Sequence, residues 1–453
     1  MTRHAPAAGG RSLPLRRVVA AASAAVLMLG LAACSNSGGG GGGGGDSEKK
    51  VALQLWDTDT RPDRTANLKA LIAMFEKENP NITISYLGLP TDSYMQKLST
   101  AIATKSTPDL VTPKASDVAA LVAQNALAPL DDRLAGSSIA KKIDPNMLKS
   151  AKAAAPDDKL YLTPATALAD AIYYRADWFQ QAGLSKPATW DDFFSDASTL
   201  TDPSAGRFGY TIRGGAGFFS QFVQMVYPMA GVGTFFDSKG RSTLDSPAVV
   251  AATEKYVSLY GKDTAKSDLT ADFKTMVAQF DNGGAAMLSH SIGSYPTHIA
   301  ALKPSQVGVV GTFPADNGKT IVTGQMVTGF GMFKAGAHQD AAWKFLEFTM
   351  SKEGNSFWAQ KSGYLPGNTD VAKESWVASN PAMTAALDTQ KAKNATVLQQ
   401  PYYLPQFSAI TTTDLLPKWQ KVLQGDESAK AFLTDAAKQL TAAQQDYLTR
   451  SKK

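Results

Sequence analysis

The stretch KVALQLWDTDTRPDRTANLKALIAMFEKENPNITISYL, residues 50–87, decides the fold class. Residues 50–56 alternate apolar and polar side chains, which predicts a strand. In residues 64–79 apolar side chains recur every three or four positions, so we expect an amphipathic helix that ends at the Asn-Pro-Asn turn. Residues 82–87 predict a second strand. A strand, a helix and a strand in this order indicate a parallel α/β unit.

The same alternation continues along the chain. The pattern predicts the following further elements: a helix over 94–104, a short strand over 109–112, a strand over 172–174, a helix over 176–182, a helix that Thr189 caps, and helices over 341–350 and 428–448. About 400 residues exceed one ordinary hydrophobic core. We therefore expect an α/β protein of two lobes, each a doubly wound parallel sheet flanked by helices.

The first 33 residues have the pattern of a secretory signal. Four arginines and no acidic residue precede an apolar stretch over residues 18–31, and small residues follow before Cys34. The apolar stretch is shorter than the roughly 20 residues of a membrane-spanning helix. We expect removal of residues 1–33 and no transmembrane helix in the remaining chain.

Cys34 is the single cysteine of the chain, so an internal disulfide is excluded. The sequence Leu-Ala-Ala-Cys at residues 31–34 resembles a bacterial lipobox, which implies lipidation of Cys34 and anchoring to the membrane. Residues 34–47 include eight consecutive glycines, which have no side chain to bury and the largest backbone entropy to lose. We expect these residues to form a flexible tether.

Composition and motifs exclude several classes of protein. Loss of the four signal arginines lowers the formal net charge from +5 to about +1, which argues against nucleic acid as a partner. The sequence contains no phosphate-binding G-x-x-x-x-G-K-[ST] motif, no G-x-S-x-G motif and no zinc-ligand spacing. We expect no enzyme activity, no metal and no cofactor.

Nine segments resemble, in the same order, the extracellular solute-binding proteins of ABC importers, of the maltose-binding-like class. These segments are LWD at 55–57, FEKENPNITI at 75–84, YMQKLSTAIATKSTPDLV at 94–111, NALAPLDD at 125–132, KLYLTPATALADAIYYRADWFQQAGL at 159–184, PATWDDF at 187–193, NGGAAML at 282–288, AAWKFLEFTMSKEG at 341–354 and GYLP at 363–366. The ordered set covers nearly the whole chain after the signal.

The resemblance implies a periplasmic-binding-protein-like fold of type II, with two hinged lobes and a central cleft. Lobe 1 is expected at residues 48–162 plus 332–380, and lobe 2 at residues 164–330 plus 381–453. Strands should cross between the lobes near residues 161–166, 328–333 and 379–383. Gly329 and Gly331 suit a hinge, because hinge residues absorb backbone change.

A sugar presents hydroxyls and flat C–H faces, so its site needs polar side chains and aromatic rings. Ligands of open α/β sheets lie beyond the carboxyl ends of strands. In lobe 1 this reasoning and the resemblance select Trp56, Asp57, Arg61, Tyr94, Lys114 and Ser116 as candidate ligand-binding residues, with core packing as the alternative for Trp56 and Tyr94.

The other candidates are at the first crossing and in lobe 2: Thr166, Asp170, Arg213, Phe218, His290, Tyr295, Gln325 and Tyr402. Asp170 interrupts an apolar stretch, and a buried acid without a partner is costly, so we expect a cleft contact or an ion pair. The family often carries a sugar-stacking tryptophan near residues 289–296, where this chain has His290 and Tyr295. That difference weakens the assignment to a sugar.

The resemblance implies capture of a sugar at the outer face of the cell membrane and delivery to the permease subunits of an ABC importer, with the binding protein as a monomer. Three alternatives stay open. First, the solute could be a different polar molecule, such as an acidic sugar, a polyol, a polyamine or a short peptide. Second, the protein could be a sensory or structural lipoprotein that binds a solute but feeds no importer. Third, it could be a glycoside hydrolase, although no sequence motif indicates the required pair of carboxylates.

Overall fold

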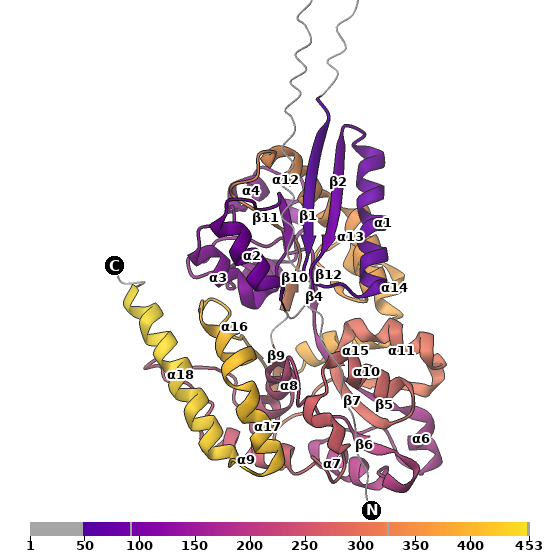
Figure 1. Ribbon diagram of the computed structural model, residues 1–453. Coiled ribbons are helices and arrows are strands. Elements are labelled where there is room, and N and C mark those ends of the chain that lie inside the picture. The colour runs from indigo at the N-terminus through magenta and orange to yellow at the C-terminus, as the bar shows by residue number, and fades with distance from the viewer. Residues whose placement is uncertain (1–48, 91–92, 324–325, 451–453) are drawn as a thin grey trace, which may run out of the picture. The chain divides into compact units, whose positions relative to one another are not determined.

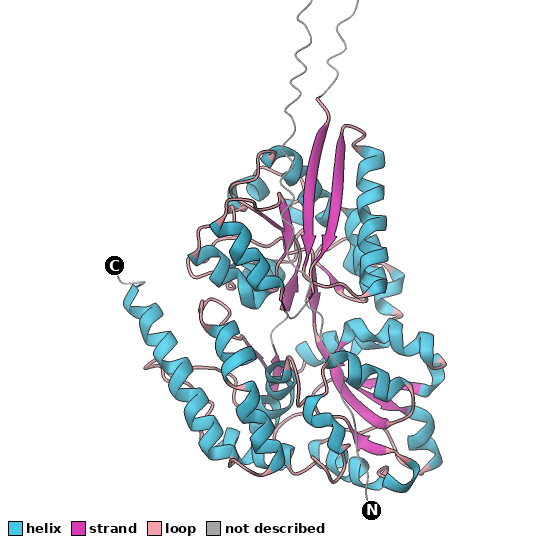
Figure 2. Cartoon of the chain, in the orientation of Figure 1, coloured by secondary structure: helices cyan, strands magenta, loops and turns pink. Residues whose placement is uncertain are grey.

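The computed structural model describes residues 49–90, 93–323 and 326–450 (Figures 1 and 2). The predicted signal, Cys34 and the tether lie outside these residues. Contacts group Lys49–Lys453 into one compact unit. Within the described residues, no helix combines the length and the apolar character that a bilayer crossing requires.

Lobe 1 is built on a four-stranded sheet of order β11-β3-β1-β2. Its strands are β1 (Val51–Asp57), β2 (Ile82–Gly88), β3 (Leu110–Thr112) and β11 (Gly331–Met332). Strand β1 pairs in parallel with β2 and β3, as the sequence predicts, and β11 runs antiparallel to β3. The accompanying helices are α1 (Pro62–Glu78), α2 (Tyr94–Ala103), α3 (Val118–Ala123), α4 (Asp131–Ala135), α5 (Pro145–Lys152), α12 (Gln339–Met350), α13 (Lys352–Ser362) and α14 (Ser375–Ala378).

A small antiparallel sheet of order β10-β4-β12 links the two lobes. Its strands are β4 (Thr166–Leu168), β10 (Met326–Thr328) and β12 (Leu365–Pro366). Next to it the chain segments approach closely: the amide of Phe330 donates to Thr163 Oγ1 at 2.9 Å, and a Cβ on Gly329 would lie 2.0 Å from the carbonyl oxygen of Thr163. Glycine is therefore required at position 329 by the close approach of two backbones.

Lobe 2 is built on a sheet of order β6-β7-β5-β8. Its strands are β5 (Asp170–Arg175), β6 (Phe208–Tyr210), β7 (Ala285–Ser291) and β8 (Val307–Val310), and β9 (Thr320–Thr323) pairs separately with β13 (Ala395–Leu398). The prediction of a parallel sheet is correct for β6 and β7 but wrong for β5, which is antiparallel to β7 and β8. The reason is connectivity: β5 follows β4 almost directly, so the chain enters this sheet from the linking end.

Lobe 2 contains ten helices in the described residues. They are α6 (Ala176–Gln181), α7 (Trp190–Thr199), α8 (Phe218–Ala230), α9 (Pro247–Val257), α10 (Phe273–Asp281), α11 (Tyr295–Ala301), α15 (Pro381–Gln390), α16 (Phe407–Ala409), α17 (Leu416–Gln424) and α18 (Ala429–Arg450). Of these, α16, α17 and α18 lie apart from the sheet, on the left of Figure 1. The predicted cap of α7 is confirmed: Thr189 and Asp192 form a reciprocal capping box.

The expectation of a strand at the third crossing, residues 379–383, is wrong. This segment begins α15, because the side chain of Asn380 accepts hydrogen bonds from the amides of Ala382 and Met383 while Pro381 occupies the first turn. The residues at which one lobe ends and the other begins stay a prediction.

We expect Gly329→Ala to lower the free energy of unfolding by about 1–3 kcal/mol, since the new Cβ must displace the backbone at Thr163. Urea unfolding followed by circular dichroism measures this. Gly136→Ala is the control, because a Cβ there meets nothing closer than 3.5 Å. Equal unfolding midpoints for the two variants would contradict the close approach.

Candidate ligand-binding site

Polar side chains from both lobes gather where strands of the two sheets end. In lobe 1 they follow β1 and β3, and in lobe 2 they follow β6, begin β5 and end β7. Ligands of α/β sheets bind at such strand ends. A side chain whose hydrogen-bonding atoms are all used within the protein stabilises the fold, whereas one with unused donors or acceptors can bind a solute.

Asp57 is fully buried at the end of β1 and serves the fold. Its Oδ1 lies 3.1 Å from Nη2 of Arg64 and also accepts the hydroxyl hydrogen of Thr112 at 2.5 Å. Tyr86 Oη approaches its Oδ2 at 3.4 Å. Burial acts to lower the pKa of Arg64, but its charged neighbours, Asp57 first among them, raise it overall, so Arg64 stays charged. The carboxylate oxygens of Asp57 are thus occupied within lobe 1.

Arg61 reaches from lobe 1 toward lobe 2. Its Nε lies 3.0 Å from Asp59 Oδ2, and its guanidinium carbon lies 5.8 Å from the ring centre of Phe273 in α10. Nη2 also donates to Tyr364 Oη at 3.4 Å. Because Asp59 neutralises Arg61, this pair adds hydrogen-bonding groups to the region between the lobes without a net charge.

Lys114 and Tyr94 lie together at the end of β3. The Lys114 ammonium is 4.7 Å from the centre of the Tyr94 ring. The Lys114 side chain is exposed to water, yet surrounding protein lowers its pKa. Lys114 is thus an exposed cation at the end of β3, and the protein around it makes its charged form less favourable than in water.

The Tyr94 hydroxyl donates to Asp117, which belongs to a 3-10 turn (Ala115–Asp117). Burial raises the pKa of Asp117 to about 6, and a hydrogen bond with Ser408 of α16 opposes this rise. Asp117 belongs to lobe 1 and Ser408 to lobe 2, so the Ala115–Asp117 turn and α16 are neighbours across the two lobes.

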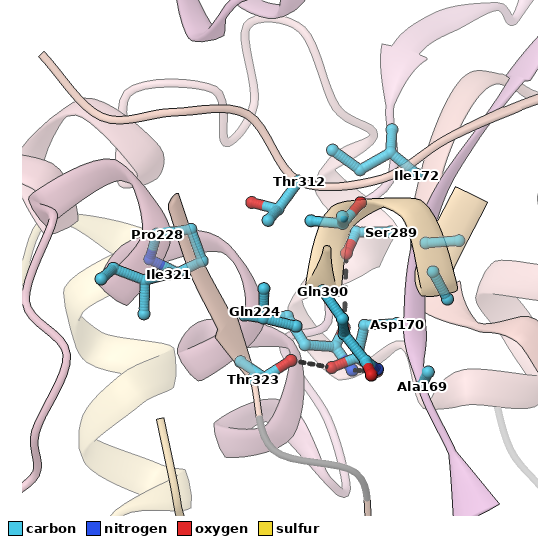
Figure 3. A pocket seen from close by; sticks show the side chains of 14 residues that line it. Ala169, Asp170, Ile172, Gln224, Pro228, Ser289, Thr312, Ile321, Thr323 and Gln390 are labelled. Atoms are coloured by element: carbon cyan, nitrogen blue, oxygen red, sulfur yellow. Dashed lines mark hydrogen bonds between the residues drawn. The ribbon is translucent and has the colours of Figure 1, made fainter. Parts of the chain in front are cut away.

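Asp170 begins β5 and anchors a hydrogen-bond network within lobe 2 (Figure 3). The amide of Gln224 in α8 donates to its Oδ1, and the hydroxyl of Thr323 in β9 donates to its Oδ2. Ser289 in turn donates to Gln224 Oε1 at 3.3 Å. Burial raises the pKa of Asp170 to about 6, while the charge of Arg213 opposes this rise.

These residues line a small cavity together with Thr312, Gln390 and apolar side chains that include Ile172, Pro228 and Ile321 (Figure 3). About 30 Å³ of it is open to the centre of a water-sized sphere, which is space for one or two water molecules. The buried Thr312 hydroxyl has no hydrogen-bond partner among the described residues. A cavity of this volume is too small to hold a sugar, so it is not itself the solute site.

Arg213 is buried after β6 and meets weak acceptors. Its Nη1 donates to the carbonyl of Gly217 at 3.1 Å, whereas Nε faces Met276 Sδ and Nη2 faces His290 Nδ1, each at 3.4 Å. Burial lowers the pKa of Arg213 to about 10. Burial and the charge of Arg213 hold the pKa of His290 well below its usual range, so His290 is neutral near pH 7.

Tyr402 packs against residues of both hydrophobic core clusters. Its ring meets Phe407 edge-on at 5.5 Å. Burial raises the pKa of its hydroxyl, and the carboxylates of Asp170 and Asp117 raise it further. An aromatic ring thus has a carboxylate of lobe 1 and a carboxylate of lobe 2 within electrostatic reach.

Other predicted residues lie elsewhere. Thr166 is buried in the linking sheet, where its hydroxyl meets Thr328 Oγ1 at 2.7 Å, and Phe218 stacks on Trp419 in the core of lobe 2. Trp56 and Tyr295 are partly buried, and both pack against the hydrophobic core cluster to which the lobe 1 sheet belongs. Ser116 Oγ donates to Asp117 Oδ1 at 3.4 Å, and Gln325 lies outside the described residues.

Contacts connect Arg61 to Phe273, Phe273 to His290 and His290 to Arg213. Lys114 contacts Tyr94, whereas Asp170 and Tyr402 contact other residues of lobe 2. Sequence reasoning did not select Asp59, Gln224, Phe273 or Ser408, which contact them. Asp59 has a signal that was available, because it follows β1 two residues before Arg61. The other three come from helices, where no strand end marks them. The described residues contain no cluster of three metal-ligating side chains.

Residues 70–385 match the family described as bacterial extracellular solute-binding protein. The chain belongs to this family. A chain of Brucella abortus (strain 2308) is 27% identical over 328 residues, 69% of this chain and 75% of that relative. A mannitol-binding protein of Pseudomonas aeruginosa is 26% identical over 399 residues, 83% of this chain and 89% of that protein.

Among solved structures, the GacH receptor of Streptomyces glaucescens, studied unliganded and with acarbose, is similar in fold. It is 22% identical, with a TM-score of 0.76, over 88% of this chain and 100% of the receptor. The similarity confirms the expected two-lobe α/β fold of the maltose-binding-like class. Membership of the family confirms the expectation of an extracellular solute-binding protein.

We expect Asp57→Ala to lower the free energy of unfolding by about 3–5 kcal/mol, because Arg64 would be left as a buried charge without its partner. Denaturant unfolding of the purified protein measures the change. Asp63→Ala is the matched control, since the Asp63 side chain is 62% exposed. A loss below 1 kcal/mol for Asp57→Ala would refute the structural role.

The raised pKa of Asp170 predicts a pH dependence of stability. Between about pH 4 and pH 6 the folded protein binds more protons at Asp170 than the unfolded chain, so the Asp170 contribution to stability falls as pH rises. Across this window the free energy of unfolding of Asp170→Asn should decline less than that of the wild type, by at most roughly 3 kcal/mol. Asp388→Asn, at a side chain 75% exposed, should keep the wild-type slope.

Proposed function

We propose that this protein captures a hydroxylated solute, a sugar or a polyol, outside the cell and delivers it to the permease subunits of an ABC importer. Family membership supports the capture of a solute. The mannitol-binding relative and the fold of the acarbose-binding receptor support a polyol or a sugar. The function requires binding and release, and no chemistry on the solute.

The surroundings of Tyr402 are the observation that carries this proposal. The carboxylates of Asp170 and Asp117, one from each lobe, both influence its hydroxyl. A sugar or polyol offers C–H groups to an aromatic ring and hydroxyl hydrogens to carboxylate oxygens. The partly buried Tyr402 ring packs against both hydrophobic core clusters, so it can offer such a molecule an aromatic face and a hydroxyl at once.

Contacts from both lobes imply a mechanism of closure. A solute that touches Asp170 and Tyr402 on one lobe and Lys114 on the other gains all its contacts in the closed form, so it shifts the population toward that form. The linking sheet, with close backbone contacts beside Gly329, is the expected hinge. The permease would then recognise the closed form.

We further propose that the protein acts as a monomer tethered to the outer face of the membrane. The lipobox resemblance at residues 31–34 supports lipidation of Cys34, and the glycine-rich residues 34–47 have the composition of a flexible linker. Metabolic labelling with a radioactive fatty acid tests this: the full-length protein should carry label, and Cys34→Ser should not.

A thermal-shift screen of the purified protein tests the solute class. A ligand at about 100 times its dissociation constant adds roughly 2.7 kcal/mol to stability. We expect a clear rise in Tm with at least one sugar, polyol or derivative of these, and no rise with polyamines or peptides. A rise with polyamines or peptides alone would contradict the proposal.

Tyr402→Ala should weaken solute binding by about tenfold or more, because the ring and its hydroxyl are lost from the cleft. Isothermal titration calorimetry measures the change. Tyr403→Ala is the neighbouring control: Tyr403 contacts Gln444 and Tyr447 of α18 instead. Unchanged affinity in Tyr402→Ala alongside an intact fold would exclude Tyr402 from the site.

A further inference from the structure

The guanidinium of Arg213 is held in a fixed position. The backbone amide of Arg213 donates to Gln221 Oε1 at 2.6 Å, and its carbonyl accepts from Trp419 Nε1 at 3.0 Å. Nη1 is tied to the carbonyl of Gly217. A side chain fixed in this way loses little entropy when it binds a ligand, which is a property of prepared binding sites.

The remaining N–H groups of Arg213 have poor partners. A thioether sulfur is a weak acceptor, and the 3.4 Å separation from His290 Nδ1 is longer than an ordinary N–H hydrogen bond. Within the part of the chain that the structure describes, no carboxylate oxygen lies within 4.0 Å of this guanidinium. A buried charge without a counter-charge is costly, so Arg213 has capacity for an anionic partner.

The two protein carboxylates that influence Arg213 through space are already engaged. Asp170 accepts from Gln224 and Thr323, and Asp272 caps α10 by accepting from the amide and the hydroxyl of Thr275 at 2.9 Å each. Moving either carboxylate to Arg213 would break these bonds. The missing negative charge therefore has to come from outside the described chain.

A second cation faces the region from lobe 1. Lys114 also has no carboxylate oxygen within 4.0 Å among the described residues. Its nearest acid in electrostatic terms is Asp59, which Arg61 already neutralises at 3.0 Å. Among the candidate ligand-binding residues that the structure describes, Lys114 and Arg213 thus have no carboxylate partner, whereas Arg61 is paired with Asp59.

We propose that the solute is a hydroxylated anion, such as a sugar acid or a sugar phosphate, whose anionic oxygens accept hydrogen bonds from Arg213 and face Lys114 of the opposite lobe. Arginine presents its N–H groups in a fork that matches a carboxylate or a phosphate. Each Asp170 oxygen accepts one hydrogen bond, from Gln224 or Thr323, and keeps a second lone pair, which accepts a hydroxyl hydrogen of the same solute. This need for both groups separates a hydroxylated anion from a simple inorganic one. The inference rests on the proposed function and names the charge of its solute.

Calorimetric titration with matched pairs of compounds tests the charge. The pairs are D-gluconate with D-glucitol, D-glucuronate with D-glucose, and D-glucose 6-phosphate with D-glucose. We expect the acidic member of at least one pair to bind at least about tenfold more tightly than the neutral member at low salt, since hydrogen bonds to charged groups are the stronger ones. Preference for the phosphate alone would identify phosphate as the anionic group and keep the proposal.

Variants assign the preference to the two cations. Arg213→Met should abolish the preference for the acidic member while retaining weak binding of the neutral one. Lys114→Met, at an exposed side chain, should reduce the preference several-fold without risk to folding. Lys97→Met is the matched control, because it removes one exposed charge of lobe 1 and should change nothing.

Three outcomes overturn the proposal. Neutral members that bind as tightly as the acids would refute the anionic solute and leave the proposed function intact. Binding of inorganic phosphate as tight as that of the hydroxylated anions would refute the role of the hydroxyls. Failure of every sugar, polyol and acid to bind would refute the proposed function together with this inference.

Discussion

A charge buried between two lobes needs a counter-charge or a full set of hydrogen bonds, and this constraint organises the site. Asp57 supplies the counter-charge of Arg64 inside lobe 1, and Asp59 supplies that of Arg61 at the lobe edge. Arg213 has no such counter-charge among the described residues, where its Nε and Nη2 face only a thioether sulfur and an imidazole nitrogen. The contrast distinguishes side chains that hold the fold together from side chains with unused binding capacity.

The linking sheet sets the geometry in which these groups meet. Strand β4 pairs with β10 and β12, so three separate segments of the chain hold the lobes together. Backbones approach so closely beside this sheet that position 329 has no space for a Cβ. Movement of two lobes about such a linkage is the hinge motion by which proteins of this architecture close around a ligand.

The sequence predicted local structure and fold class well. Periodicity located β1, α1, β2 and the cap of α7, because hydrophobic spacing and cap chemistry are local properties. The antiparallel direction of β5 depends on how the chain enters the sheet, which periodicity does not show. The helix at residues 381–390 depends on the Asn380 cap, but the resemblance to the family led to the prediction of a strand there.

The site was predictable in part. Strand ends pointed to Arg61, Lys114 and Arg213. Phe273 and His290 connect Arg61 with Arg213 through a chain of contacts, whereas Lys114 contacts Tyr94. Sequence position did not show that Asp57 is satisfied by Arg64 or that Phe218 stacks on Trp419, since both depend on tertiary neighbours. Gln224 and Ser408 were missed for the same reason, as their roles arise from contacts between helices and distant strands.

The central claim is that one solute contacts both lobes and thereby closes the cleft. The most direct measurement is the distance between spin labels on exposed positions of β2 and α7, one in each lobe, with and without the solute that gives the largest rise in Tm. The account predicts a shorter and narrower distance distribution when the solute is bound. A distribution that does not change at saturating solute would contradict closure and assign binding to a single lobe.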